Sequence, residues 1–364
     1  MFTVNVILLF GLVLVGFIIT LRDKKSFNLM MLVLVLFSVF ISLLISERTT
    51  NYGDMIQNDT AVYNNYFNCL KEGRLKGCEN VVIEIPGNEL MLGMIARTVI
   101  FFKLDNSIIF FIISFFLCSS YLYFIRPLGV LMPLGFFLFL TSPIFWELSS
   151  NVIRASLSVS FFLLLISMFA MGNHSSYKKV TMYVGGCLSH SSFFIYTPLF
   201  LLYRKIKVET LFILFLCGLA LSPILTKFLF GFIGLLLSDF IIGKKIVFYM
   251  SKSTGSGVMN YIYVIGKMNI VMIFFLYSVY KQTKNEWFIS TFKVLLLLLV
   301  AGSFLGDTNF VYRIINVYEL LLIPLIVFSL KTRAKYVGVV FVIYATYKLY
   351  MFDYFYENYI RFFQ

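Results

Sequence analysis

Apolar stretches of about twenty residues, separated by short polar connections, constrain this chain more than any other feature. A stretch of that length can cross a hydrocarbon core of about 30 Å as a helix. It must be helical there, because lipid offers no hydrogen-bond partners to an open backbone. Only 13% of the residues are charged, whereas an ordinary globular domain has roughly 25%. The sequence therefore predicts an all-α polytopic integral membrane protein.

The hydropathy pattern predicts about 10–12 transmembrane helices within a single membrane domain, residues 1–364. The first apolar stretch lacks a basic leader and a small-residue cleavage site, so we expect a retained span rather than a signal peptide. The candidate spans lie near residues 3–21, 27–46, 105–124, 128–146, 151–172, 208–225, 261–280, 288–306, 312–330 and 335–352.

The formal net charge of +13 comes mostly from Lys and Arg in the short connections, such as Lys24-Lys25 and Lys178-Lys179. This distribution follows the positive-inside rule, which assigns those connections to the cytoplasm. The basic residues form no nucleic-acid-binding motif, so no nucleic-acid partner is expected. Two larger loops, 47–104 and 226–260, then lie outside, and residues 89–103 of the first are expected to form an interfacial helix.

Residues 180–203 are flanked by basic residues at both ends. Two arrangements fit this pattern. In one, two short helices meet near residues 188–192 as a re-entrant hairpin. In the other, a single normal span violates the charge rule at one end.

The cysteines and the missing motifs limit the chemistry. Cys69 and Cys78 share one polar loop and can form a disulfide if that loop faces an oxidising compartment. The chain has no Cys/His spacing typical of a metal site and no GxGxxG, GxxxxGK[ST], HExxH or GxSxG motif. Neither a metal nor a cofactor is expected.

Three arginines lie at predicted external ends of spans: Arg48, Arg154 and Arg313. An ionisable side chain at membrane depth costs about 2.5–3.5 kcal/mol on insertion scales, so it usually marks a functional site. The planar guanidinium is well suited to a phosphate or pyrophosphate. Arg154 and Arg313 also have polar neighbours, Asn151 among them. We therefore predict an anion-binding site, the alternative being arginines that extend to the lipid headgroups.

His190 stands between small hydroxyl residues, Ser191 among them, within an apolar segment. It is a candidate base, or a hydrogen-bond donor to a hydroxyl or phosphate, although a packed structural histidine is the simpler alternative. In the first external loop, Asp59 and Tyr63 are four residues apart and share a face if the segment is helical.

The order of these residues resembles the EpsG-type and Wzy-type polysaccharide polymerases. The most specific part is Ile153-Arg154 at the start of a span, followed by His190-Ser191 further along the chain. The pattern also includes Arg48, Asp59 and Tyr63 in the external loop, Pro86-Gly87, and Arg313 with Tyr318. The chain departs from the family at Ala155, where Gln is common, and at Ile85, where Glu is common.

The resemblance implies an enzyme of the bacterial inner membrane with its active site facing the periplasm. Such an enzyme transfers a growing glycan from undecaprenyl pyrophosphate to the non-reducing end of a lipid-linked repeat unit. Its partners are the donor, the acceptor, the bilayer and a chain-length regulator. The implied catalytic residues are His190, Arg154, Arg313 and Asp59, and the implied substrate-binding residues are Arg48, Tyr63, Glu84, Asn151, Ser191, Tyr312 and Tyr318.

Two other functions stay open. One is a different membrane glycosyltransferase or ligase that uses a polyprenyl-linked donor. The other is a flippase or transporter of lipid-linked oligosaccharides. Transporters often have internal repeats and broken helices at the midplane, and no internal repeat is visible in the sequence.

Overall fold

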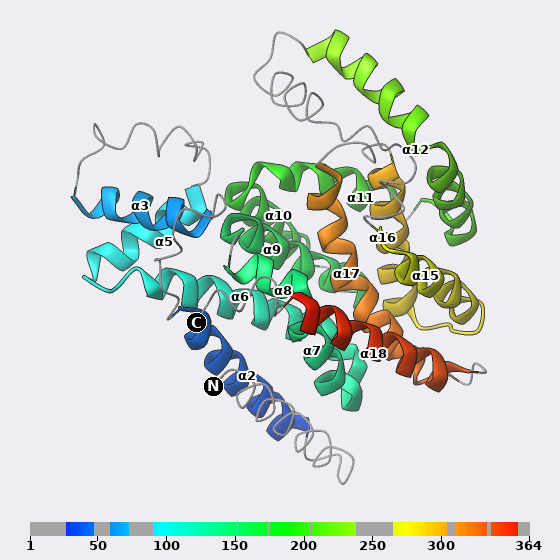
Figure 1. Ribbon diagram of the computed structural model, residues 1–364, viewed down its shortest axis with the longest axis horizontal. Helices are drawn as coiled ribbons and strands as arrows, with labels where there is room; N and C mark the ends of the chain where they lie inside the picture. Colours follow the sequence, from blue (N-terminus) through cyan, green and yellow to red (C-terminus); the bar gives the residue numbers. More distant parts are fainter. Residues whose placement is uncertain are drawn as a thin grey trace. The chain divides into compact units, whose positions relative to one another are not determined.

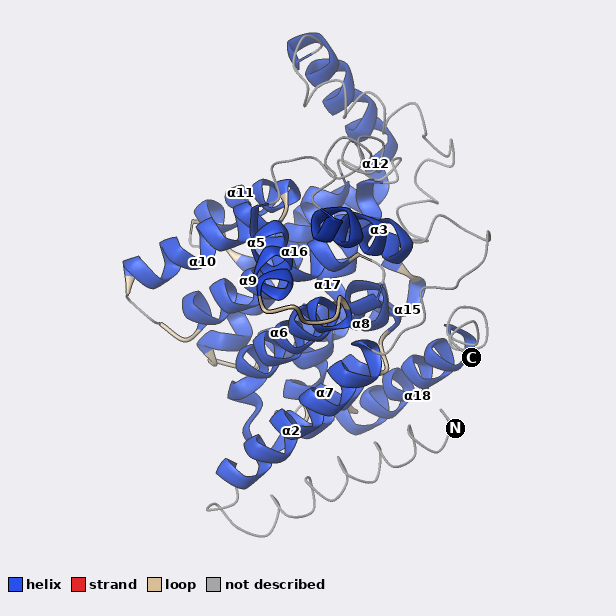
Figure 2. Ribbon diagram, turned by 90° about the vertical axis from the view of Figure 1, so that its left-hand side faces the viewer, coloured by secondary structure: helices blue, strands red, loops and turns tan. Residues whose placement is uncertain are grey.

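The computed structural model describes residues 27–46, 59–72, 90–150, 152–172, 175–203, 205–237, 265–303, 310–332 and 336–355. In these residues the regular structure is entirely helical, with no strand (Figures 1 and 2). The chain divides into two compact units, Met1–Tyr196 with Ala345–Gln364 and Thr197–Tyr344. We call these the first and second units and describe each by itself.

The first unit is built on a series of neighbouring helices. Helix α2 packs along α6, α6 along α9, and α9 along α10 (Figure 1). The unit also contains two helices before α6, a broken segment after it, and a 3-10 helix after α10. Their bounds are α2 Phe27–Ser46, α3 Asp59–Glu72, α5 Leu90–Phe101, α6 Ser107–Ile125, η3 Arg126–Leu131, α7 Met132–Leu140, α8 Pro143–Ser150, α9 Ile153–Ala170, α10 Ser176–Ser189 and η4 Ser191–Tyr196.

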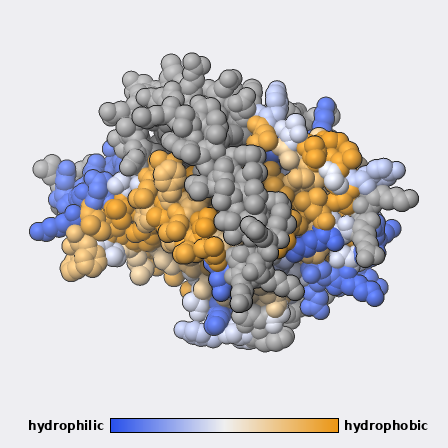
Figure 3. Space-filling model, turned by 90° about the horizontal axis from the view of Figure 1, so that it is seen from below, coloured by the Kyte–Doolittle hydropathy of each residue, from blue (hydrophilic) through white to orange (hydrophobic). Residues whose placement is uncertain are grey.

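Helix α2 has the two-sided character of a helix at the rim of a membrane bundle. Leu32 and Leu36 are more than half exposed, and Leu29 and Phe40 nearly so, whereas Leu34 and Ile41 are buried. Large apolar side chains are exposed at low cost only to lipid, so the outer side of α2 is suited to acyl chains. Figure 3 shows extensive apolar surface on one face of the molecule, with hydrophilic residues at its margins.

The predicted span 128–146 is wrong as a single helix. The chain instead forms η3, α7 and α8, with Gly129 at a positive φ of 56° inside η3. Helix α7 folds back on the end of α6, where Tyr121 and Phe139 stack with ring centroids 3.9 Å apart. At 1.5 Å per residue, α7 reaches only about 14 Å. Pro143 is the first residue of α8, and Pro127 and Pro133 are the second residues of η3 and α7. A proline suits these positions because it lacks the N–H that would continue the previous helix.

The break between α7 and α8 is closed by hydrogen bonds. The Trp146 indole Nε1 donates to the Leu140 carbonyl at 2.9 Å, and the Thr141 hydroxyl donates to the Leu138 carbonyl at 3.1 Å. The Thr141 and Ser142 side chains are buried. Backbone carbonyls freed at a helix break are costly in an apolar setting, so these donors stabilise the interruption.

The second unit contains α11 Thr197–Leu202, α12 Val208–Leu237, α15 Lys267–Tyr280, α16 Glu286–Ser303 and α17 Phe310–Ser329. Helix α16 packs against both α12 and α17. Gly218 permits the close approach of α12, since an added Cβ would stand 2.7 Å from the Ser303 hydroxyl on α16. Helix α18, Val337–Phe355, begins in this unit and ends in the first.

Within the described residues, four helical segments are long and apolar enough to cross a membrane: Phe27–Ser46, Ser107–Leu140, Ile153–Ala170 and Glu286–Ser303. The second runs through α6, η3 and α7, so it is a folded segment rather than one straight span. Shorter apolar helices include Lys267–Tyr280 and Val317–Ser329. These features confirm the predicted all-α polytopic membrane fold.

Candidate functional site

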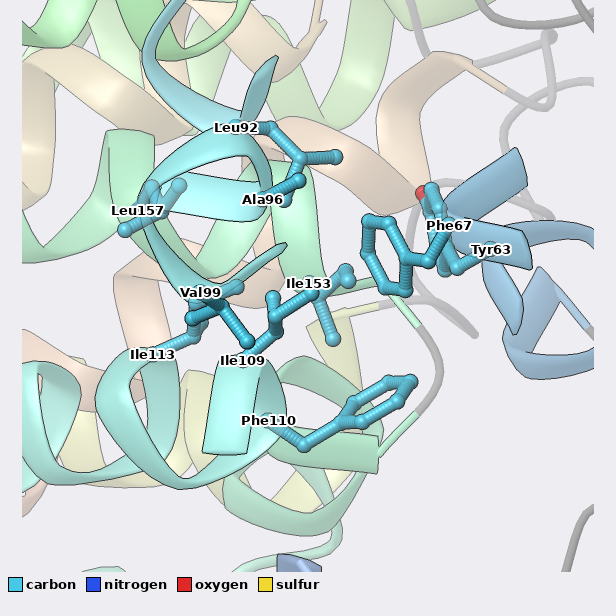
Figure 4. Packing of buried hydrophobic residues seen from close by; sticks show 10 residues of the cluster. All are labelled: Tyr63, Phe67, Leu92, Ala96, Val99, Ile109, Phe110, Ile113, Ile153 and Leu157. Atoms are coloured by element: carbon cyan, nitrogen blue, oxygen red, sulfur yellow. The ribbon is translucent and has the colours of Figure 1, made fainter. Parts of the chain in front are cut away.

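Within the first unit, a compact apolar cluster holds helix α3 against α5, α6 and α9 (Figure 4). Tyr63 and Phe67 are one helical turn apart on α3 and are 1% and 0% exposed. They meet side chains of α5, α6 and the start of α9, where Ile153 and Leu157 complete the cluster. Fully burying one such side chain contributes about 1.5–3 kcal/mol. The α3 segment, which hydropathy alone does not mark, is thus fixed beside the first turn of α9.

This packing places Tyr63 against Arg154. Arg154 Nε donates to the Tyr63 hydroxyl at 2.7 Å, across 91 positions of sequence. The guanidinium carbon lies 5.5 Å from the ring centroid. Because Nε binds the hydroxyl, the guanidinium approaches the hydroxyl edge of the ring, and the hydrogen bond dominates over the cation–π contact. A hydrogen bond to a charged group stabilises by about 1.5–3 kcal/mol. The bond therefore fixes the orientation of the Arg154 guanidinium, the group predicted from the sequence to bind an anion.

His190 and Arg154 lie at the same end of a helical hairpin. Helices α9 and α10 are joined by a short turn and pack side by side (Figure 1). Gly185 of α10 lies opposite the Phe161 ring of α9. Arg154 is seven residues before Phe161, and His190 is five residues after Gly185. At a rise of 1.5 Å per residue, the heights of Arg154 and His190 along the hairpin axis therefore differ by only about 3 Å.

Helix α10 ends at His190, the position at which the predicted re-entrant hairpin of residues 180–203 would turn; the choice between that hairpin and a single span stays a prediction. His190 is 8% exposed and extended, with φ −159° and ψ 133°. Its N–H donates to the Gly186 carbonyl at 3.2 Å, and its carbonyl accepts from Phe193 N–H at 3.0 Å. The backbone of His190 is therefore held on both sides by the residues that fold around it.

Two glycines make this fold possible. A Cβ on Gly186 would stand 2.5 Å from Cδ2 of the Phe193 ring and closer still to two other ring atoms. A Cβ on Gly185 would stand 2.6 Å from the Phe161 ring. Phe193 is fully buried and packs edge-on to Tyr183, with ring centroids 5.6 Å apart. The Gly185-Gly186 pair near the end of α10 is the sequence signal for this close packing, and it is not among the predicted site residues.

Cys69, near the end of α3, is disulfide-bonded. Cys118, Cys187 and Cys217 are free thiols, and Cys78 lies outside the described residues. Disulfides persist in oxidising compartments. The state of Cys69 is that expected of a cysteine in a loop on the external side.

The remaining predicted site residues are described less fully. Asp59 is the first residue of α3 and Ser191 the first of η4, while Tyr312 and Arg313 lie in the first turn of α17. The side chains of these four are not among the described ones. Arg48, Glu84 and Asn151 lie outside the described residues altogether. Arg313 belongs to the second unit and Arg154 to the first, so the predicted grouping of the two stays a prediction.

Tyr318 is buried in the second unit and ties the start of α15 to α17. Its hydroxyl donates to the Ile265 carbonyl and accepts from the Asn269 amide. The same amide also donates to the Ile265 carbonyl at 2.8 Å. In this state the Tyr318 hydroxyl fixes the backbone before α15.

Lys348 is a buried cation that is not among the predicted site residues. It lies on α18 and is 2% exposed, with Nζ 5.8 Å from the Tyr347 ring centroid. Its signal was a lysine inside the apolar run 335–352. Among the described residues, no group of three His, Cys, Asp or Glu side chains is placed to hold a metal.

The described part of the chain is a polytopic helical bundle in which the half-buried Arg154 and the buried His190 lie at the same end of the α9–α10 hairpin. The EpsG family model matches residues 31–364. The chain therefore belongs to the EpsG family. Neither a curated protein nor a solved structure matches it.

Proposed function

We propose that this chain is a membrane glycosyltransferase that polymerises an O-antigen or exopolysaccharide. It would transfer the growing glycan from undecaprenyl pyrophosphate to the non-reducing end of a lipid-linked repeat unit, at the periplasmic face of the bacterial inner membrane. The observation that carries the proposal is the 2.7 Å bond from Arg154 to Tyr63, which joins two family-pattern residues 91 positions apart. Membership in the EpsG family and the disulfide at Cys69 support the class and the orientation.

The proposed glycan transfer requires a cation, a base and an acceptor held in a fixed position. The acceptor hydroxyl forms a bond to the anomeric carbon of the growing glycan as the bond from that carbon to the pyrophosphate oxygen breaks. Arg154 would stabilise the charge that develops on the pyrophosphate. His190, at the same end of the hairpin, would take the proton of the acceptor hydroxyl.

Tyr63 has a positioning role in this scheme. Its hydroxyl fixes the plane of the Arg154 guanidinium, and a planar fork donor binds phosphate well only when it is correctly oriented. Because Tyr63 belongs to α3, the same contact ties the cation to the predicted external loop. The cation is then oriented before the substrate arrives, which lowers the cost of binding it.

The test is the surface polysaccharide of a strain whose own gene is replaced by Arg154→Ala, Arg154→Lys or His190→Ala. We expect single capped repeat units in place of a ladder on a gel, with Arg154→Lys also defective because an ammonium lacks the bidentate fork. The matched control is Arg97→Ala, which removes an exposed arginine from α5 of the same unit.

The outcomes separate the alternatives. Loss of all capped material would favour a flippase or a ligase instead. An unchanged ladder in both Arg154→Ala and His190→Ala would refute the assignment of these residues. Tyr63→Phe keeps the packing and removes only the hydroxyl, so we expect a weakened ladder rather than none.

A further inference from the structure

Helix α3 has two distinct faces. With about 100° of rotation per residue, Tyr63, Phe67, Tyr66 and Leu70 gather on one side, which packs on the apolar cluster. Asn64, Asn65 and Asn68 fall together within about 100° on the opposite side. Asn65 and Asn68 are exposed and Asn64 is half-buried. We call these three residues the asparagine arc.

The composition of the arc is unusual for a solvated helix face. Asn is a weak helix former, because its side chain competes for backbone hydrogen bonds. Exposed positions that only need solubility are better served by Glu, Lys or Gln. Helix formation therefore does not explain three asparagines in a helix of 14 residues.

A fourth asparagine extends the arc. The Asn106 amide Nδ2 donates to Asn68 Oδ1 at 2.9 Å, linking α3 to the start of α6. Asn106 Oδ1 is buried and accepts no hydrogen bond within the described part of the chain. Buried acceptors are nearly always satisfied in native proteins. A ligand hydroxyl at this end of the arc would supply the missing donor once the Asn106 side chain turns this oxygen outward.

The chemistry of the arc selects its ligand. Each amide both donates and accepts hydrogen bonds without carrying charge, and sugar hydroxyls do the same. Lys71 lies at one edge of the arc and Glu72 falls within it, and their charges are opposite. The surface therefore offers no cationic patch for an anionic lipid headgroup. On the adjoining side of the same helix, Tyr63 binds Arg154.

We propose that the asparagine arc, together with Asn106, binds the uncharged sugar residues of the growing glycan outside the reacting bond. This rests on the proposed function, since it names how the same substrate is held beyond the site at Arg154. The arc would retain the chain between successive additions. Its loss would then shorten the product without stopping the first transfers.

The direct test is binding by the purified protein in lipid nanodiscs. The probe is a set of oligosaccharides released by mild acid from the producing strain's own polysaccharide and fractionated by size. We expect the triple variant Asn64→Ala/Asn65→Ala/Asn68→Ala to bind fragments of several repeat units at least about tenfold more weakly. The control is Gln282→Ala, which removes an exposed amide from the second unit.

Folding does not confound this test, since alanine strengthens a helix that contains asparagine. The single variant Asn65→Ala keeps the Asn68–Asn106 bond and should weaken binding in part. Unchanged binding in the triple variant overturns the proposal, and so does an equal loss in Gln282→Ala. Binding of released oligosaccharides does not depend on catalysis. An unchanged ladder in both Arg154→Ala and His190→Ala would thus refute the assignment of those two residues while leaving the result for the arc readable.

In cells, the triple variant should produce a ladder whose most abundant chain length is shorter than normal. Arg154→Ala should remove the ladder itself. A triple variant with a normal chain-length distribution contradicts the retention role, whatever its affinity for released fragments.

Discussion

The sharpest prediction concerns Gly186, which controls how the chain turns at His190. An alanine Cβ would stand 2.5 Å from Cδ2 of the buried Phe193 ring, whereas carbon atoms at rest are about 3.5–4.0 Å apart. The ring must therefore move by about 1 Å or more. Since Phe193 N–H binds the His190 carbonyl at 3.0 Å, the histidine moves with it. A displacement of this size at a reacting group costs roughly 100-fold in rate.

The cost in stability is smaller than the cost in activity. Overpacking a core costs about 1–3 kcal/mol, and replacing a helical glycine by alanine returns about 0.8–1.0 kcal/mol. Gly186→Ala should therefore lower the free energy of unfolding by at most about 2 kcal/mol. The protein folds, but His190 is displaced.

Two other glycines provide matched controls. Gly185→Ala meets the Phe161 ring at 2.6 Å, but Phe161 is only half-buried and can turn aside. Gly93→Ala meets only the Tyr66 hydroxyl, at an ordinary 3.7 Å. We expect the loss of activity to fall in the order Gly186, Gly185, Gly93, with Gly93→Ala near normal.

The assay is the rate of chain growth by purified protein in proteoliposomes, with lipid-linked repeat units taken from a polymerase-deficient strain. Phe193→Leu provides a double-mutant cycle, because a smaller side chain should relieve the clash and reduce the cost of Gly186→Ala. The explanation is refuted if Gly186→Ala is as active as Gly93→Ala. It is also refuted if Gly186→Ala lowers the rate of chain growth by the same factor in the wild-type protein and in the Phe193→Leu variant.

Two further predictions concern stability. The Ser107 backbone N–H donates to Asp105 Oδ1 at 2.8 Å, and this bond, with that from the Ser107 side chain, holds the pKa of Asp105 below its ordinary value of 3.8. Because the pKa of Asp105 is lower in the folded state, its charged carboxylate stabilises the fold at any pH above the ordinary pKa. This stabilisation is lost as the pH falls through the folded-state pKa. Asp105→Ala should thus cost up to about 1 kcal/mol at pH 7. The difference in thermal unfolding should begin to shrink only below about pH 4 and disappear as the pH falls through the lowered folded pKa; a constant difference contradicts it. Gly218→Ala should cost about 1–3 kcal/mol by overpacking against Ser303. Adding Ser303→Gly to Gly218→Ala should restore the melting temperature, and failure of this rescue would exclude the clash with Ser303 as the cause of the lower stability. As a control, Gly338→Ala faces open space and should leave the melting temperature unchanged.

The elements best predicted from sequence are those whose signal is local. An apolar run of span length gives its own helix, so α2 coincides with the predicted 27–46 and α9 lies within the predicted 151–172. The segment 89–103, predicted as an interfacial helix, contains the helix α5; its place at the interface stays a prediction. The run 128–146 failed because hydropathy averages over the prolines that divide it. The predicted 208–225 is shorter than α12, which continues to Leu237.

The site was predictable only residue by residue. Arg154 and His190 stand out as polar interruptions of apolar runs. No local pattern indicates that Tyr63 bonds to Arg154, because that contact depends on α3 packing over the start of α9. The Gly185-Gly186 pair was visible, but its meaning depends on two rings that approach it from other turns.

The interruption between α7 and α8 has a consequence for the permeability of the membrane. A broken helix usually admits water to satisfy its freed carbonyls, and a file of water conducts protons. Here the Leu140 and Leu138 carbonyls are already occupied by the Trp146 indole and the Thr141 hydroxyl, and the polar side chains of the break are buried. These two carbonyls therefore need no water as a hydrogen-bond partner, and the interruption itself does not draw water into the bundle at this point.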